Sequence, residues 1–464
     1  MENHLERLRH GAKRLAQENA GVRIARLRRL RDAVARHRPA LHEAFQEDLG
    51  KGGDAVDLSE LLTVGLEIEH AIAHVRAWMK PRRVGGPVPF WGTSSELHVQ
   101  PKGASLIVAA WNYPFLLTIG PLVSAIAAGC SAALKPSEFT PSVGAAVAEM
   151  LSGTFSDEEV RVVQGGEDVS GALTAQPWDH IYFTGSSRVG SLVMASAAKN
   201  LTSVTLELGG KSPTIVDETA DLDRAAQRIA FGKFSNTGQT CIAPDYVYVH
   251  ASRHDALVDA LRRAVRSMYP EGMSSPDYQR VISSRHHARL AAMCADATIR
   301  GAAVSLGGEA DSTALEIAPT LLTDVPEDSV VMQEEIFGPV LPILPYASLE
   351  EVVEGINSRP APLSLYVFSN RRQTVREILA RTRSGGVVIN DTVLQFANPH
   401  LPFGGIGQSG MGRGHGYWGF LEFSNLRSVL RQRRRFPLTR LLHPPYTGAR
   451  RRLIGFLLRR YGLR

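Results

Sequence analysis

The sequence predicts an α/β fold in which two doubly wound parallel-sheet domains are joined by a small β element for bridging or oligomerisation. Short apolar strands alternate with helical segments from about residue 105 to residue 208, and the same alternation resumes at residue 214. Such alternation is typical of parallel sheets that helices cover on both faces. A polar, alternating segment at residues 96–100 fits neither sheet and predicts a strand that projects from the body.

Helices dominate the first 80 residues. Leu, Ile, Val and Ala recur at helical spacing among Arg and Glu over residues 5–49 and 58–79, and Pro81 ends the pattern. The first sheet follows as short apolar runs, each bounded by turn residues. We predict its strands at residues 105–111, 131–135, 160–163, 181–184 and 204–208, and its helices from about 118, over 145–151 and from 190 to 199.

The second α/β unit begins after the two glycines that follow Leu208. Between its first helix and its second strand lies a loop that contains Cys241. We predict strands at residues 214–216, 246–249 and 386–390, and helices at residues 222–231 and 255–268.

The composition is that of a globular protein. Of the 464 residues, 44% are hydrophobic and 21% are charged, and neither a signal peptide nor a run of about 18 apolar residues is visible. The three cysteines, Cys130, Cys241 and Cys294, are odd in number and far apart, which favours a reducing cytoplasm over a disulfide framework or structural zinc. We therefore expect a cytoplasmic protein of two or more domains.

Positive charge is concentrated at the end of the chain. The net charge is +6, but residues 427–464 contain twelve arginines and no acidic residue, which leaves residues 1–426 with a net charge of −6. A mildly acidic body does not indicate binding to nucleic acid.

The segment from Thr237 to Pro244 places Cys241 among small and polar residues, ahead of a proline that stops regular structure. A thiol in such a loop can ionise and meet a substrate, whereas a thiol in an apolar run mostly fills volume. A single loop cysteine is nevertheless more often inert than catalytic. What favours a catalytic role is the set of polar residues that follow other strands.

Two of these residues are candidates for the chemistry itself. Glu207 ends an apolar strand before two glycines, where partial burial would raise its pKa and make it a general base near neutral pH. Asn112 follows another apolar strand, where its side-chain amide can donate to a developing oxyanion. The alternatives are a capping or ion-paired carboxylate for Glu207 and a turn asparagine for Asn112.

Two further segments are candidates for a nucleotide site. Gly185 and Gly190 bracket the turn between a strand and a helix, where glycine lets a pyrophosphate approach the main chain. Lys135 and Glu138 follow another strand end, where open α/β sheets bind ligands, and both can hydrogen-bond ribose hydroxyls. The alternatives are a tight strand–helix turn at Gly185 and Gly190 and a solvated turn at Lys135 and Glu138. The scattered histidines show no metal-ligand spacing, so no metal site is predicted.

Taken together and in this order, seven motifs resemble those of the aldehyde dehydrogenase superfamily. The segment from Gly410 to Phe420 and the short N-terminus resemble its class 3 branch, which includes fatty-aldehyde, aromatic-aldehyde and coniferyl aldehyde enzymes. The seven motifs lie between about residues 110 and 425: Trp111-Asn112-Tyr113-Pro114, Leu134-Lys135-Pro136-Ser137-Glu138, Phe183-Thr184-Gly185-Ser186, Leu206-Glu207-Leu208-Gly209-Gly210-Lys211, Gly238-Gln239-Thr240-Cys241, Glu335-Ile336-Phe337-Gly338-Pro339 and Pro402-Phe403-Gly404-Gly405.

The resemblance implies a role for each matching residue. Cys241 would be the nucleophile, Asn112 and the Cys241 main-chain N–H would hold the oxyanion, and Glu207 would activate the water that releases the acid. The cofactor would be NAD or NADP, and Tyr113 and Phe403 would line an apolar substrate pocket. The implied cofactor-binding residues are Lys135 and Glu138 at the adenosine ribose, Gly185 and Ser186 at the pyrophosphate, and Glu335 and Phe337 at the nicotinamide ribose, together with Gly190 and Leu208.

The implied activity is NAD(P)-dependent oxidation of an apolar aldehyde, long-chain aliphatic or aromatic, through a cysteine thiohemiacetal and thioester that water hydrolyses. The alternatives are an acylating enzyme that passes the thioester to coenzyme A and a catalytically silent, membrane-associated relative. The resemblance also implies an NAD(P)-binding domain (residues 1–85 and 103–207), a catalytic domain (208–400) and bridging elements (86–102 and about 420–430) that form a homodimer.

The basic tail, residues 431–464, needs a separate explanation. Its segment 450–460 interleaves large apolar side chains with arginines at both ends. It is expected either to lie as a short helix on an anionic membrane, peripheral to the cytoplasm, or to pack on the dimer or over the substrate entrance.

Overall fold

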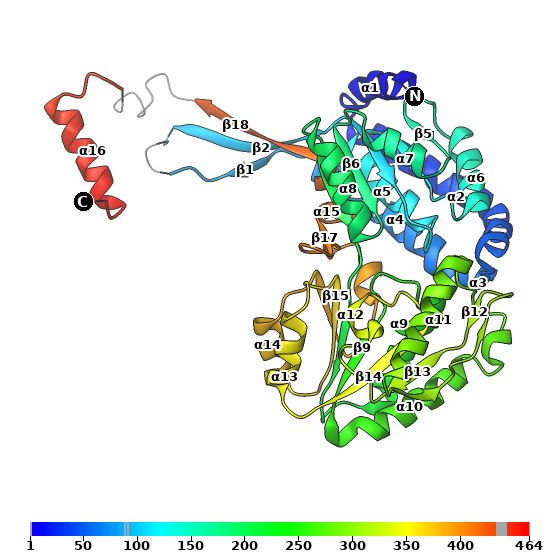
Figure 1. The fold of residues 1–464 in the computed structure, drawn as a ribbon. Helices are drawn as coiled ribbons and strands as arrows, with labels where there is room; N and C mark the ends of the chain where they lie inside the picture. The colour runs from blue at the N-terminus through cyan, green and yellow to red at the C-terminus, as the bar shows by residue number, and fades with distance from the viewer. Residues whose placement is uncertain (1, 88–89, 91, 433–442, 464) are drawn as a thin grey trace.

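The computed structural model describes residues 2–87, 90, 92–432 and 443–463. Figure 1 shows two bodies, each built on a sheet with helices around it, and a long β arm that projects from the first body. The first body and the arm are built from the chain before residue 208 and after residue 400, and the second body from the chain between them. The α/β fold is confirmed.

The first body contains a six-stranded sheet in the order β17-β7-β6-β3-β4-β5, in which only β17 is antiparallel to its neighbour. Its core is formed by the strands together with apolar faces of the surrounding helices. The strands are β3 (Ala104–Val108), β4 (Ser131–Lys135), β5 (Val160–Val162), β6 (His180–Thr184), β7 (Ser203–Glu207) and β17 (Gly410–Met411). The helices are α1 (Glu2–Leu15), α2 (Ala20–Leu49), α3 (Gly53–Val56), α4 (Leu62–Trp78), α5 (Leu116–Ala128), α6 (Pro141–Ser152), α7 (Glu167–Thr174), α8 (Ser187–Ala198) and α15 (Gly416–Glu422).

The second body contains a seven-stranded sheet in the order β10-β13-β14-β9-β8-β15-β16, parallel except for β10. Apolar clusters on its faces form the second core. The strands are β8 (Pro213–Val216), β9 (Tyr246–His250), β10 (Ala303–Leu306), β13 (Thr320–Thr323), β14 (Val340–Tyr346), β15 (Ser364–Phe368) and β16 (Gly386–Ile389), with a hairpin of β11 (Ala310–Asp311) and β12 (Glu316–Ile317). The helices are α9 (Leu222–Phe234), α10 (His254–Met268), α11 (Ser284–Ile299), α12 (Val330–Gln333), α13 (Leu349–Asn357) and α14 (Arg372–Arg381).

The arm is a three-stranded antiparallel sheet of β1 (Arg82–Val84), β2 (Thr93–Pro101) and β18 (Ser424–Gln432). The projecting strand predicted at residues 96–100 is therefore confirmed and lies at the centre of this sheet (Figure 1). The arm begins at Arg82, earlier than the bridging segment predicted from residue 86. The chain after residue 400 returns to the first body, where β17 pairs with β7 and α15 packs against α5.

Several predicted boundaries are wrong: β3 ends at Val108 and not at residue 111, and α6 begins at Pro141 and not at residue 145. The helix expected after Gly190 begins at Ser187, because the Ser186 side chain accepts a hydrogen bond from the Val189 N–H and caps the helix N-terminus. Gly190 therefore lies inside α8 and is not part of the turn. A Cβ there would lie 2.7 Å from Cδ2 of Leu208, so the missing side chain lets α8 pack closely on the chain that follows β7.

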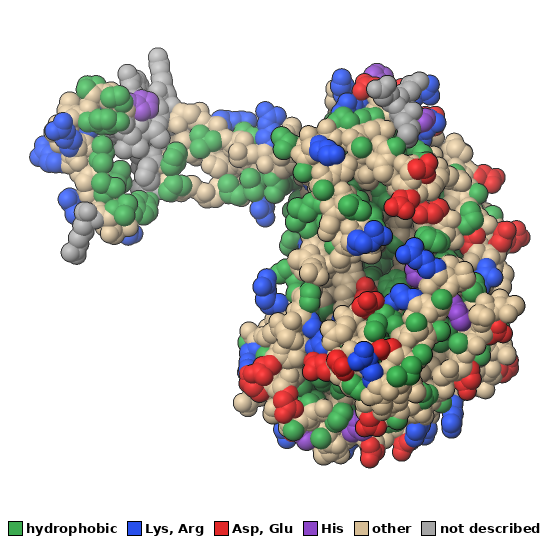
Figure 2. All heavy atoms as spheres, in the orientation of Figure 1, with side chains coloured by type: hydrophobic (Ala, Val, Ile, Leu, Met, Phe, Trp, Pro, Cys, Tyr) green, Lys and Arg blue, Asp and Glu red, His purple; other side chains and the backbone are tan. Residues whose placement is uncertain are grey.

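Within the basic tail, the segment 450–460 lies in helix α16 (Gly448–Arg460). The helix has no buried residue and lies beyond the outer end of the arm, away from both bodies (Figure 1). Figure 2 shows hydrophobic and basic side chains together on this outlying part. The first part of the tail, residues 433–442, lies outside the described residues. Among the helices described here, none is both long enough and apolar enough to cross a membrane.

Candidate active site

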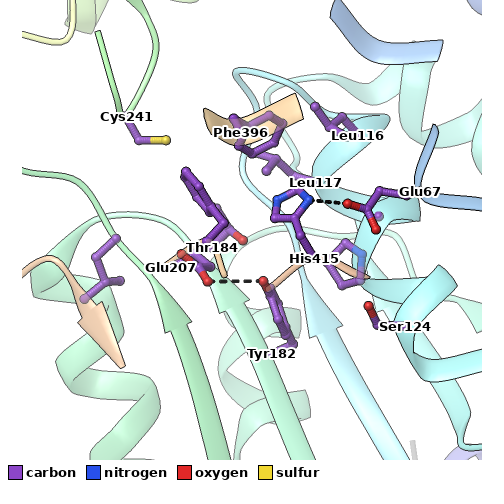
Figure 3. A pocket seen from close by; sticks show the side chains of 14 residues that line it. Glu67, Leu116, Leu117, Ser124, Tyr182, Thr184, Glu207, Cys241, Phe396 and His415 are labelled. Carbon is purple, nitrogen blue, oxygen red and sulfur yellow. Dashed lines mark hydrogen bonds and ion pairs between the residues drawn. The ribbon is translucent and has the colours of Figure 1, made fainter. Parts of the chain in front are cut away.

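A pocket is lined by residues from both bodies and contains two of the three predicted catalytic side chains. Cys241 comes from the loop after α9, and Glu207 comes from the end of β7 (Figure 3). The wall is largely apolar, and its other members come from α4, α5, β6 and the chain around residues 396–415. They are Glu67, Leu116, Leu117, Gly120, Pro121, Ser124, Tyr182, Thr184, Leu208, Phe396, Phe403 and His415.

The cysteine loop is held in an uncommon backbone conformation. Asn236 and Thr237 have φ values of 53° and 54°, and Gly238 has a φ of 70°. A Cβ on Gly238 would lie 2.2 Å from the carbonyl oxygen of Gly338, so only glycine fits at this position. The tight turn brings Cys241 back to the pocket immediately after helix α9.

The Cys241 thiol is half-buried and is protonated at neutral pH in this structure. Burial raises its pKa to about 12, and the charges of Glu335 and Glu207 act in the same direction. The main-chain N–H groups of Cys241 and Ile242 act in the opposite direction because they hydrogen-bond the sulfur. The thiol therefore needs a further positive charge or a proton acceptor in order to react.

Glu207 is buried at the end of β7, next to the pocket. Its Oε1 accepts a hydrogen bond of 3.3 Å from the Tyr182 hydroxyl, and its Oε2 has no partner among the described residues. Burial raises its pKa well above the usual range, and the Glu422 charge adds to this effect, while Tyr182 and Arg413 oppose it. A raised pKa makes the ionised carboxylate a stronger base, which can take a proton from a water molecule near neutral pH.

Asn112 lies behind the cysteine loop and is 3% exposed. Its Nδ2 donates a hydrogen bond of 3.1 Å to the main-chain oxygen of Gln239, which also accepts from Asn236 Nδ2 at 3.0 Å. A side-chain amide has two N–H donors, so one remains for another acceptor. Asn112 is thus fixed against the loop that carries Cys241, although it is not among the residues that line the pocket.

The two predicted substrate-pocket residues lie in different places. Phe403 is in the pocket wall. Tyr113 lies outside it, with its hydroxyl 2.8 Å from the Thr240 hydroxyl and its ring under the Lys51 ammonium, 4.7 Å from Nζ. Tyr113 therefore contacts the residue before Cys241 directly, and its contact with a substrate stays a prediction.

The cofactor-binding candidates of the first body gather at the carboxyl ends of parallel strands. Lys135, the last residue of β4, is buried and donates to Glu138 Oε2 at 3.0 Å and to the Pro136 carbonyl at 2.8 Å. Gly185 and Ser186 lie between β6 and the N-terminus of α8. Strand ends and a helix N-terminus at one sheet edge are the usual setting for a nucleotide in α/β folds.

Glu335 and Phe337 come from the loop before β14. Burial raises the pKa of Glu335 to about 7, and the charge of Asp245 adds to this effect. Its carboxylate lies against the main chain after β7, since a Cβ on Gly209 would be only 2.4 Å from both Glu335 oxygens. Phe337 has a φ of 49° and packs edge-on against Trp111 at 5.4 Å.

Sequence reasoning missed three residues near the site. Glu67 and His415 line the pocket, and Glu67 Oε1 lies 2.6 Å from His415 Nδ1. Because they are 348 residues apart, no local pattern connects them. Lys233, on the last turn of α9, is buried without a hydrogen-bond partner in the described chain, and burial lowers its pKa to about 8. The apolar spacing of α9 would have shown only that Lys233 faces inward.

These features are typical of α/β enzymes with a cysteine nucleophile and a carboxylate base. The family model for the aldehyde dehydrogenase family matches residues 2–429. The chain is 42% identical to the 4,4'-diaponeurosporen-aldehyde dehydrogenase of Staphylococcus aureus, over 93% of each chain. It is also 42% identical to the probable coniferyl aldehyde dehydrogenase of Pseudomonas aeruginosa, over 97% of this chain and 96% of the relative. The mouse aldehyde dehydrogenase family 3 member B1 is 40% identical, over 98% and 96%.

Solved structures show the same likeness. The substrate-bound state of Staphylococcus aureus AldH superimposes with a TM-score of 0.94 at 39% identity, over 98% of this chain and 99% of that chain. The NAD+ complex of an aldehyde dehydrogenase from Bacillus cereus gives 0.82 at 28% identity, over 92% and 87%. The chain therefore belongs to the aldehyde dehydrogenase family, as the motifs predict, and its resemblance to the class 3 branch is confirmed.

Proposed function

We propose that this protein catalyses the NAD(P)-dependent oxidation of an apolar aldehyde to the carboxylic acid, with Cys241 as nucleophile and Glu207 as general base. The observation that carries the proposal is the placement of both side chains in one largely apolar pocket, where Glu207 Oε2 is left without a partner among the described residues.

The residues at the carboxyl edge of the first sheet fit a dinucleotide. Thr184 Oγ1 is a buried polar atom that has no partner in the described part of the chain, and it lies just before the turn at Gly185 and Ser186. Ser186 and the N-terminus of α8 would hold the pyrophosphate, with Lys135 and Glu138 at the adenosine ribose. Glu335 and Phe337 would hold the nicotinamide ribose. The oxidised nicotinamide supplies a hydride acceptor and a positive charge near the thiol.

The reaction begins when the Cys241 thiolate attacks the aldehyde carbonyl carbon and forms a tetrahedral thiohemiacetal alkoxide. The remaining Asn112 N–H donates to that oxygen, a contribution typically of about 3 kcal/mol for one donor. Loss of hydride from this carbon leaves a thioester on Cys241. Glu207 then removes a proton from water, the hydroxide attacks the thioester carbonyl, and the acid leaves as the thiol is restored.

The substrate would be a largely apolar aldehyde, because Leu116, Leu117, Phe396 and Phe403 dominate the pocket wall. Relatives whose names specify diaponeurosporen-aldehyde and coniferyl aldehyde support an aldehyde of this kind, aliphatic or aromatic.

The test is an assay of reduced cofactor at its absorbance maximum, with NAD and then NADP, on aldehydes from short aliphatic to C16 and on benzaldehyde and cinnamaldehyde. Wild type should oxidise members of the panel, and the Cys241→Ala variant should oxidise none. Release of an acyl-coenzyme A in place of the free acid would contradict the hydrolytic step. Cysteine-independent turnover would contradict the mechanism as a whole.

The homodimer belongs to the same proposal. Strand β18 is the edge of the arm and leaves one side of its nine residues without a strand partner among the described residues. Leu426 and Leu430 are exposed there, 51% and 57%. A second copy that covered this edge would hydrogen-bond the main chain of β18 and bury the two leucines. Light scattering should give a dimer for wild type and a monomer for the Leu426→Arg/Leu430→Arg variant, whereas a monomeric wild type would contradict the dimer.

For the tail, we propose peripheral binding to anionic membrane from the cytoplasm. Helix α16 has exposed Phe456 and Leu458 and carries Arg450, Arg451 and Arg452 near its N-terminus. Basic residues near an anionic surface contribute about 1 kcal/mol each. Wild type should sediment with phosphatidylglycerol vesicles and not with phosphatidylcholine vesicles, and deletion of residues 443–464 should abolish this. Equal sedimentation of both proteins would contradict the proposal.

A further inference from the structure

The pocket contains a polar pair that the proposed reaction does not use. His415 Nδ1 and Glu67 Oε1 are 2.6 Å apart, and Glu67 Oε2 accepts a hydrogen bond of 3.0 Å from the Gly416 N–H. The side chains of His415 and Glu67 are only 11% and 5% exposed. Both line the pocket together with Cys241 and Glu207 (Figure 3).

This pair fixes which nitrogen of His415 carries a proton. Burial alone would raise the pKa of Glu67, but the contacts with His415 Nδ1 and the Gly416 N–H lower it. Glu67 is therefore a carboxylate, which only accepts hydrogen bonds, and Nδ1 must be the donor. In the neutral ring the other nitrogen, Nε2, then has a free lone pair and is an acceptor.

Nε2 of His415 makes no hydrogen bond within the described chain. Figure 3 shows this nitrogen on the side of the ring that faces away from Glu67. The rings of Phe396 and Phe403 lie nearly perpendicular to the imidazole, with centroids 4.6 and 5.3 Å from its own, and hold it in place. His415 also has a φ of 68°, a conformation that non-glycine residues seldom adopt and that clusters at ligand sites.

A purely apolar substrate would take Nε2 out of water and give it no partner, which is unfavourable. A substrate hydroxyl at this position would donate to Nε2, and a neighbouring aromatic ring would contact Phe396 and Phe403. We propose that His415 is a specificity-determining residue whose Nε2 accepts a hydrogen bond from the substrate, so that the preferred aldehydes are hydroxyaryl aldehydes. Glu67 is the positioning residue that orients the imidazole. This inference rests on the proposed aldehyde oxidation and deepens it.

The test compares matched substrates with and without the hydroxyl group. These are 4-hydroxybenzaldehyde against benzaldehyde and 4-hydroxycinnamaldehyde against cinnamaldehyde. For wild type, kcat/KM should favour at least one hydroxylated member by about 10-fold or more, since sites built to bind a hydroxyl reject the analogue that lacks it. In His415→Asn this ratio should fall to within about 2-fold of one. The unsubstituted aldehydes should lose little.

The matched control is His74→Asn. His74 is a half-buried histidine on α4 that does not line the pocket, so the substrate ratio should stay as in wild type. A merely structural role of His415 would lower both members of each pair equally and leave the ratio unchanged, which would overturn the inference. Wild type without a preference for any hydroxylated aldehyde would also overturn it, while leaving the aldehyde oxidation itself intact.

Binding provides a readout that does not depend on turnover. By titration calorimetry, wild type should bind 4-hydroxycinnamate about 10-fold more tightly than cinnamate, and His415→Asn should bind both alike. If wild type oxidises no aldehyde, the proposed function fails. Equal binding of the two acids by wild type would then separately reject the role of His415.

Discussion

The side-chain amide of Asn112 donates a hydrogen bond of 3.1 Å to the main-chain oxygen of Gln239, two residues before Cys241. The first body thus supplies the amide and the second supplies the nucleophile, and this hydrogen bond is one of those that join the two segments. The second N–H of the same amide is the donor that the proposed oxyanion requires.

Replacing Asn112 with alanine should therefore slow the oxidation more than it slows other reactions of the thiol. We expect a loss of about 100- to 1000-fold in the rate of the reduced-cofactor burst, typical for removal of one oxyanion donor. Alkylation of Cys241 by iodoacetamide, which forms no oxyanion, should stay within about 3-fold of wild type. Stopped-flow absorbance and mass spectrometry measure the two rates. An equal loss in both would mean that Asn112 only supports the loop.

The reactivity of Cys241 should depend on the two carboxylates near it. At pH 9 Glu335 is ionised, because its pKa is about 7, and its charge acts with burial to raise the pKa of Cys241 to about 12. Glu335→Gln should therefore lower the thiol pKa and speed alkylation at pH 9. One pKa unit is a 10-fold change in thiolate, so about 3- to 10-fold is expected.

The alkylation rates are best compared in a Cys294→Ala background, since the half-buried Cys294 is the other thiol within reach. Glu207→Gln should have a smaller effect, because the charge of Glu207 raises the pKa of Cys241 less than the charge of Glu335 does. Slower alkylation in Glu335→Gln would show that Glu335 supports the thiolate and does not oppose it.

Gly238→Ala should disrupt the cysteine loop. Its Cβ would lie 2.2 Å from the Gly338 carbonyl oxygen, and the φ of 70° adds strain for any side chain. We expect a loss of at least about 2 kcal/mol in the free energy of unfolding by urea. Gly272→Ala is the matched control, because its φ is 60° but nothing lies within 4 Å of the added Cβ. Equal losses in both variants would show that the contact with Gly338 relaxes freely.

The parts of the fold that depend on local pattern could be predicted from the sequence. The strand that ends at Lys135 and the arm strand at residues 96–100 follow from apolar runs and alternation, so their positions were correct. The start of α8 was misplaced because Gly190 was interpreted as a turn residue. Its actual role, close packing against Leu208, depends on a contact with the chain after β7 that the local sequence does not reveal.

The candidate site was predictable only where motifs mark it. Cys241, Glu207 and Asn112 each stand in a short distinctive segment, and the fold brings all three to the same region. His415 also stands in such a segment, but its interaction depends on Glu67 from the other end of the chain. Long-range pairs of this kind come from the topology, in which the chain after residue 400 returns to the first body.

A single-turnover experiment on Glu207→Gln is the sharpest test of whether Cys241 forms a thioester that Glu207 helps to hydrolyse. The variant would be mixed with the best wild-type aldehyde and cofactor, and reduced cofactor and intact protein mass would be followed together. We expect a burst of about one reduced cofactor per site, no further turnover and an acyl group on Cys241 by peptide mass. Sustained turnover without an acyl adduct would contradict it.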